Sequence, residues 1–111
     1  MKFRNWLIIC LVAFMLPKVC ISAQVWSGET TITKLYPTST DYIFNVSYSN
    51  SVSTCDGGTR FSIRKTYSDN YNALVSSLIA AFIAGKKITF VFDDSQAANC
   101  FPYIDRFQIL P

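Results

Sequence analysis

Few side chains of this sequence are of the types that enzymes use for acid–base or nucleophilic chemistry. The chain contains no histidine, the commonest general base and a frequent metal ligand. Asp93 and Asp94 are adjacent carboxylates, but neighbours at a strand end point apart and are typical of a turn. Cys55 and Cys100 are better explained as disulfide partners than as nucleophiles, which need a free thiol beside a base. We therefore expect a protein that is not an enzyme and holds no metal or cofactor.

The aromatic residues indicate more about the function of this protein than the ionisable residues do. They lie mainly in or beside predicted strands, next to Ser, Thr and Asn. An aromatic ring with hydroxyl and amide neighbours suits a sugar, whose C–H face stacks on the ring while its hydroxyls form hydrogen bonds. The alternative is that most of these rings fill the core of a small domain. The set comprises Trp26, Tyr36, Tyr42, Phe44, Tyr48, Tyr67, Phe90, Phe92, Phe101 and Tyr103.

The first residues predict a secretory signal peptide. A basic start is followed by an unbroken apolar run over residues 6–16, and small residues follow Lys18. We expect cleavage after Ala23 or Ser22, so that 1–23 is the leader and 24–111 is a single domain. A retained anchor helix is the alternative, although the run is shorter than the 20 or so residues that a membrane span needs.

Removal of the leader changes the charge of the protein. The whole chain has 10 Lys and Arg against 7 Asp and Glu, a formal net charge of +3. Lys2, Arg4 and Lys18 leave with the leader, so the mature chain is formally neutral. Because phosphate backbones are bound by basic surfaces, we expect no nucleic-acid partner.

Cleavage also leaves Cys55 and Cys100 as the two remaining cysteines, since Cys10 and Cys20 lie in the leader. In an exported protein they most simply form one disulfide, and export to the medium or the periplasm provides the oxidising compartment. The bridge would close a loop of about 46 residues and stabilise the fold by about 4 kcal/mol in the chain-entropy model.

Residues 68–87 predict one helix, with Ser68 or Asp69 as cap and Gly85 at its end. Its apolar stripe is formed by Tyr71, Leu74, Val75, Leu78 and Phe82. Its other face is small and uncharged, with Ala73, Ser76, Ser77, Ala80 and Ala84. Small residues let another backbone approach closely, so we expect this face to form an oligomer interface. An ordinary surface helix is the alternative, and we expect no membrane insertion.

Five strands are predicted, at residues 29–36, 42–49, 60–65, 87–92 and 103–110. In the fourth strand Ile88, Phe90 and Phe92 alternate with Thr89 and Val91. Three strands, a helix and two strands follow the order of the oligomer-binding (OB) fold, a five-stranded barrel that is mainly β with one helix. An open antiparallel sheet crossed by one helix fits the same order.

Short motifs over most of residues 26–104 resemble a known family. They are Trp26-Ser27-Gly28, Thr31-Ile32-Thr33, Ser51-Val52-Ser53-Thr54-Cys55, Phe61-Ser62, Tyr71-Asn72-Ala73-Leu74, Ala84-Gly85-Lys86-Lys87-Ile88, Phe92-Asp93 and Phe101-Pro102. In these motifs the chain is similar to the B subunit of subtilase cytotoxin and its pertussis-like relatives. The resemblance implies a secreted OB-fold protomer in a ring of five, with helices lining a central pore.

The same resemblance implies binding sites and partners. Ser27 matches a serine that contacts sialic acid, Ser49 falls near a polar contact, and Phe92 stands where that subunit has a sugar-contacting tyrosine. The expected function is that of a secreted, non-enzymatic B subunit of an AB5-like toxin, which binds sialylated host-cell glycans and delivers a separate catalytic A subunit. The alternative is an orphan secreted or periplasmic OB-fold module that binds protein and has no lectin activity.

Overall fold

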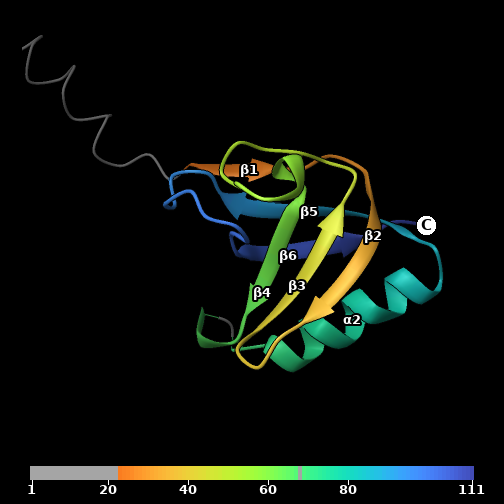
Figure 1. The fold of residues 1–111 in the computed structure, drawn as a ribbon. Helices are drawn as coiled ribbons and strands as arrows, with labels where there is room; N and C mark the ends of the chain where they lie inside the picture. The colour runs from red at the N-terminus through yellow and green to blue at the C-terminus, as the bar shows by residue number, and fades with distance from the viewer. Residues whose placement is uncertain (1–22, 68) are drawn as a thin grey trace, which may run out of the picture.

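The computed structural model describes residues 23–67 and 69–111. The predicted leader therefore lies almost entirely outside the described residues. The described part of the chain forms six strands, one α-helix and two short 3-10 turns (Figure 1). Their bounds are β1 Gln24–Trp26, β2 Thr30–Pro37, β3 Asp41–Val46, η2 Asp56–Gly58, β4 Arg60–Arg64, η3 Lys65–Tyr67, α2 Tyr71–Ile83, β5 Lys87–Asp93 and β6 Ile104–Ile109.

The strands form an antiparallel sheet in which β5 is the central element. It pairs with β6 on one edge, and on the other it pairs first with β2 and further along with β1. β1 and β2 are thus two halves of one edge, interrupted at Gly28, whose φ of +72° is the left-handed conformation that glycine adopts easily. The predicted first strand, 29–36, corresponds to β2, and the sequence analysis missed β1.

The other edge of β2 continues the sheet through β3 to β4. β4 and β6 lie close together but are not paired as strands; an isolated parallel bridge joins Ser62 of β4 to Tyr103, just before β6. There the Ser62 amide donates to the Pro102 carbonyl oxygen at 2.9 Å, and the Ser62 hydroxyl donates to the Phe101 carbonyl oxygen at 2.9 Å. The mainly β fold with one helix is confirmed. The sheet is open, and its strand order is compatible with the predicted barrel.

The core is aromatic and lies between the sheet and α2. The rings of Phe44, Phe61, Phe90 and Phe92 are fully buried, and the Phe61 and Phe90 centroids are 4.9 Å apart. Leu78 of α2 is also fully buried in this cluster. The helix packs against β2 and β4 at one end of the sheet (Figure 1).

α2 ends as predicted, and four of the five residues of the predicted stripe, Tyr71, Leu74, Val75 and Leu78, pack in or against the core. Gly85 has φ +65°, and its amide donates to the Phe82 carbonyl while the Lys86 amide donates to that of Ala81, the Schellman arrangement. Ala81 is 2% exposed whereas Phe82 is 38% exposed, so the assignment of Phe82 to the core was wrong. The small Ala81 side chain lets the last turn approach the sheet, which leaves Phe82 at the rim. The helix begins at Tyr71, and the residue before it makes no side-chain cap.

Candidate functional site

Ser27, the first predicted glycan contact, lies where β1 ends. Its hydroxyl donates to the Gly28 carbonyl oxygen at 2.8 Å and accepts from the Phe90 amide at 3.0 Å. Its own amide donates to the Phe90 carbonyl oxygen at 2.9 Å. The hydroxyl thus bridges the interruption between β1 and β2, and one oxygen lone pair remains to accept a bond from a ligand.

Trp26, next to Ser27, carries an exposed aromatic ring. Its side chain is 49% exposed, and the Arg106 guanidinium lies 5.7 Å from the ring centroid. The register of β1, β5 and β6 places Trp26, Val91 and Arg106 in one cross-strand row. An exposed ring and a cation therefore lie together in this row, and the Ser27 hydroxyl follows at the next position of the chain. Aromatic rings with polar neighbours are the composition expected of a sugar contact.

Ser49 lies at the same end of the sheet, in the loop after β3, and is exposed. The preceding residues are tied to the start of β2, because the Tyr48 amide donates to the Thr30 hydroxyl at 2.9 Å and that hydroxyl is 2.9 Å from the Ser47 hydroxyl. The break after Ser27 leads directly into Thr30, so the fold brings both predicted serines to one region.

Phe92 does not belong to this surface. Its ring is fully buried, with centroids of Phe61, Phe90 and Tyr48 at 5.4, 5.8 and 6.1 Å. Alternation along β5 points Phe92 inward with Ile88 and Phe90. The predicted sugar contact at this position is corrected accordingly, because a ring packed among three others cannot stack on a surface ligand.

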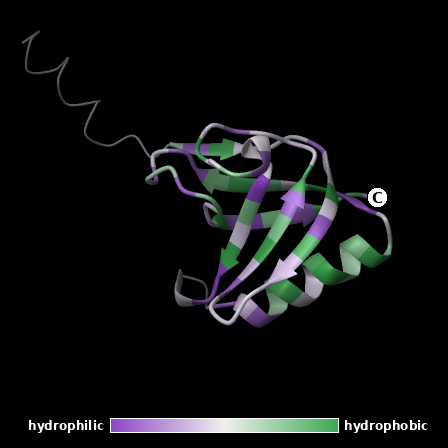
Figure 2. Cartoon of the chain, in the orientation of Figure 1, coloured by the Kyte–Doolittle hydropathy of each residue, from purple (hydrophilic) through white to green (hydrophobic). Residues whose placement is uncertain are grey.

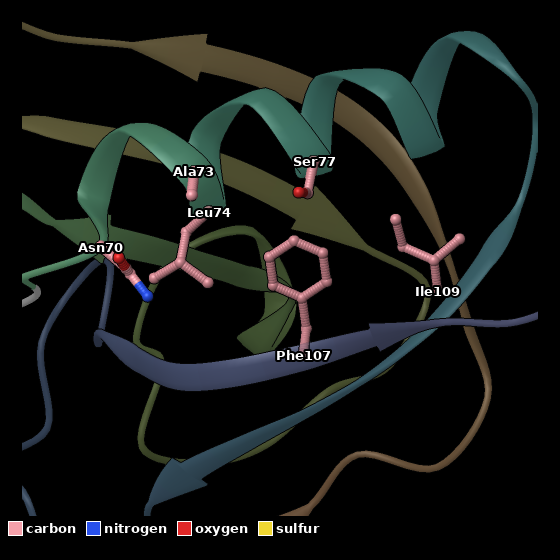
Figure 3. A pocket seen from close by; sticks show the side chains of 6 residues that line it. All are labelled: Asn70, Ala73, Leu74, Ser77, Phe107 and Ile109. Atoms are coloured by element: carbon pink, nitrogen blue, oxygen red, sulfur yellow. The ribbon is translucent and has the colours of Figure 1, made fainter.

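The predicted oligomer interface on α2 is exposed in this chain. Ala73, Ser76, Ser77, Ala80 and Ala84 all lie at the surface. Ala73 and Ser77 face a groove of about 260 Å³ between α2 and β6 (Figure 3). This volume is below the 300 Å³ or so of small-molecule sites and suits an inserted side chain better than a ligand. Asn70, Leu74, Phe107 and Ile109 complete its lining.

Large apolar side chains lie beside this small face. Ile83, which lies next to Ser76 on the helix surface, is 78% exposed, and Ile109 at the groove is 43% exposed. No charged residue occurs from Asn70 to Gly85. Figure 2 shows apolar residues along much of α2, including its C-terminal half. An uncharged helix face with exposed apolar side chains beside it is typical of an interaction site.

The predicted disulfide is confirmed. Cys55 and Cys100 are joined across a separation of 45 residues. Next to the bridge, Asp56 Oδ2 accepts from Asn45 Nδ2 at 2.8 Å and from Arg60 Nε at 3.0 Å. The hydrogen bond from Asn45, with the bond and charge of Arg60, lowers the pKa of Asp56 although desolvation opposes it.

Asp93 is the last residue of β5, and Asp94 begins the turn that follows. Asp93 Oδ1 accepts from the Ser95 amide at 2.9 Å and from its hydroxyl at 2.6 Å, and these bonds lower the pKa of Asp93. Within residues 23–67 and 69–111, no three Cys, Asp or Glu side chains are grouped as metal ligands. No helix in that part of the chain is long and apolar enough to cross a membrane.

Comparisons with protein-family models, with curated proteins and with solved structures find no match for this chain. The resemblance to pertussis-like B subunits therefore stays a prediction.

Proposed function

We propose that this chain is a secreted, non-enzymatic glycan-binding subunit that assembles through the exposed face of α2, in the manner of the B subunit of an AB5-like toxin. The observation that carries the proposal is the combination, on one small domain, of an uncharged helix face and a separate polar edge with an exposed Trp26 ring. The Cys55–Cys100 disulfide is typical of proteins in oxidising compartments.

The assembly part of the proposal follows from α2. An isolated domain normally places Lys and Glu on the outer face of its helix, whereas this face offers Ala and Ser with Ile83 beside them. A copy packed on this face covers the apolar surface, and a ring of copies places several glycan sites on one side. When several sites of the ring bind one cell surface, their combined affinity far exceeds that of a single site. The ring, together with the separate A subunit that it carries, is then held firmly at the cell surface.

Solution mass tests the assembly. We expect the purified protein to be an oligomer, with a pentamer as the family expectation, by light scattering at micromolar concentration. Ala80→Glu introduces a charge on the small face and is expected to give a monomer. Thr33→Glu, at an exposed position of β2, is the matched control and should leave the mass unchanged. A wild-type monomer at this concentration would contradict the proposal.

A glycan array tests the binding part. We expect signal for sialylated glycans, and we expect this signal to fall about tenfold or more for Trp26→Ala. The substitution removes the ring on which the sugar stacks, a central contact of the proposed site. Ser27→Ala should weaken binding as well, although it also removes a bond that holds the β1–β2 break. Thr33→Ala removes an exposed side chain of β2 that has no part in the proposed site and serves as control.

The second candidate, a secreted module that binds protein without lectin activity, is favoured by two observations. Phe92 is buried, and the Ser27 hydroxyl already makes two hydrogen bonds. An oligomer or monomer that binds no glycan on the array would support this candidate and refute the first.

A further inference from the structure

The outer face of β2, β3 and β4, away from the core, carries a cross-strand row of side chains that ends in an exposed ring. Register places Tyr36, Ile43 and Ser62 in one cross-strand row, and the parallel bridge extends it to Tyr103. Paired residues share a face of the sheet. Ile43 and Ser62 are buried whereas Tyr36 is half exposed, so the row has a closed middle and an exposed ring at one end. We call this set the outer row.

Cationic side chains border the rings of the outer row. Lys34 Nζ lies 5.9 Å from the Tyr36 ring centroid and Arg60 Cζ lies 5.8 Å from it. At the other end Arg64 Cζ lies 5.0 Å from the Tyr103 ring centroid. The two tyrosines are three strand spacings apart, about 14 Å between Cα atoms, a span that suits a short oligomeric ligand better than a single small molecule.

Asn45 supplies a buried acceptor beside this row. Register places Asn45 between Lys34 and Arg60 on the same face, and Asn45 is 6% exposed. Its Nδ2 donates to Asp56, yet its Oδ1 is buried and has no hydrogen-bond partner among the described residues. Buried acceptors are normally satisfied, so this atom is suited to a donor that arrives with a ligand. The neighbouring Lys34 side chain is exposed and long enough to move aside.

These groups define the chemistry of a ligand. The Tyr36 ring fits a ring with an apolar face, the exposed Lys34 fits a carboxylate, and a hydroxyl can donate to Asn45 Oδ1. Arg60 adds positive charge nearby but is itself paired with Asp56. We propose that the outer row binds an acidic oligosaccharide built of uronic acids. In OB folds the corresponding strands form a ligand-binding face for oligosaccharides and oligonucleotides. The proposal is independent of the one made for Trp26 and Ser27, which lie on β1 and its end.

A single-stranded nucleic acid fits this face less well. Arg60 is already paired with Asp56 at 2.8 Å, and Arg64 stands opposite Asp41 across the strands. A phosphate on every residue needs a denser array of unpaired cations than this face offers. A polyol with dispersed carboxylates matches both the moderate positive charge and the buried acceptor.

Binding of an oligogalacturonate hexasaccharide to the purified protein tests the proposal by titration calorimetry. We expect binding that weakens as salt rises, with no binding of maltohexaose, the neutral comparison. Lys34→Glu should weaken binding about tenfold or more, because an attraction becomes a repulsion. Lys86→Glu makes the same charge change after α2 and should leave the affinity unchanged. Tyr36→Leu should also weaken binding while keeping an apolar side chain over the row.

Amide chemical shifts measured on the unmodified protein keep the test independent of folding of the variants. Oligogalacturonate should shift the amides of 34–36, 43–45 and 60–62 and leave those near Ser27 unchanged. No binding, equal affinity for Lys34→Glu and Lys86→Glu, or shifts confined to the Ser27 edge would each overturn the proposal. Binding of oligothymidylate in place of oligogalacturonate would overturn it in favour of a nucleic-acid surface. Loss of sialoglycan binding in Trp26→Ala with oligogalacturonate binding retained would separate the two sites.

Discussion

Replacement of Phe92 by Tyr distinguishes a core residue from a sugar contact. The added hydroxyl would lie among the rings of Phe61, Phe90 and Tyr48, whose centroids are within 6.1 Å of that of Phe92. Burial of a hydroxyl without a partner costs about 1–3 kcal/mol, and overpacking of a filled core costs a similar amount. We therefore expect Phe92→Tyr to lower the free energy of unfolding by about 2–5 kcal/mol and to leave glycan binding no stronger.

Urea unfolding followed by circular dichroism measures this change, and Phe107→Tyr is the control. Phe107 is half-buried and lines the open groove beside α2, where a hydroxyl reaches water, so its substitution should change the unfolding free energy by less than about 0.5 kcal/mol. A Phe92→Tyr protein as stable as wild type with tighter sialoglycan binding would refute the burial argument, because it would place the hydroxyl at the surface.

Three further predictions concern the loop that contains Cys55. Replacement of Cys55 and Cys100 by Ser together should lower the unfolding free energy by about 4 kcal/mol, measured in urea with reduced wild type as comparison. The folded-state pKa of Asp56 is lowered from 3.8, so its ionised form stabilises the fold above that pH and this contribution is lost on acidification. Asp56→Asn should therefore make the free energy of unfolding fall less steeply as the pH is lowered. Gly58→Ala should destabilise the fold more than Gly57→Ala in thermal unfolding, since both have positive φ but only at Gly58 would Cβ meet a backbone oxygen, at 2.7 Å.

The parts of the fold that depend on local periodicity were predictable from sequence. The helix, its end at Gly85 and five of the six strands follow from alternation, helical spacing and turn residues, and the disulfide follows from the number of cysteines left after the leader. β1 was missed because three residues before a glycine break carry too little pattern. Its partner is β5, far along the chain, so only tertiary pairing shows that Gln24–Trp26 is a strand.

Phe92 shows how two kinds of sequence argument can disagree. Alternation along the strand grouped Phe92 with Ile88 and Phe90, whereas the family resemblance assigned it to a surface contact. The structure agrees with the alternation, because the Phe92 ring is fully buried among the rings of Phe61, Phe90 and Tyr48, although the pairing of β5 with β6 is irregular between Val91 and Phe92. The assignment of a residue to a binding site by family resemblance is therefore weakened when strand alternation places that residue in the core.

Strand alternation could not predict which residues on the outer face of the sheet are buried. Val91 and Ile43 point away from the core yet are 0% and 3% exposed, because each occupies a middle strand whose row also holds an aromatic side chain on the edge, Trp26 or Tyr36. Side chains paired across strands are neighbours, so we expect each ring to cover part of its apolar partner while it presents its own surface to solvent. Truncation of either ring perturbs stability and binding together. The charge change at Lys34, which leaves the row intact, is consequently the stronger test of what this face binds.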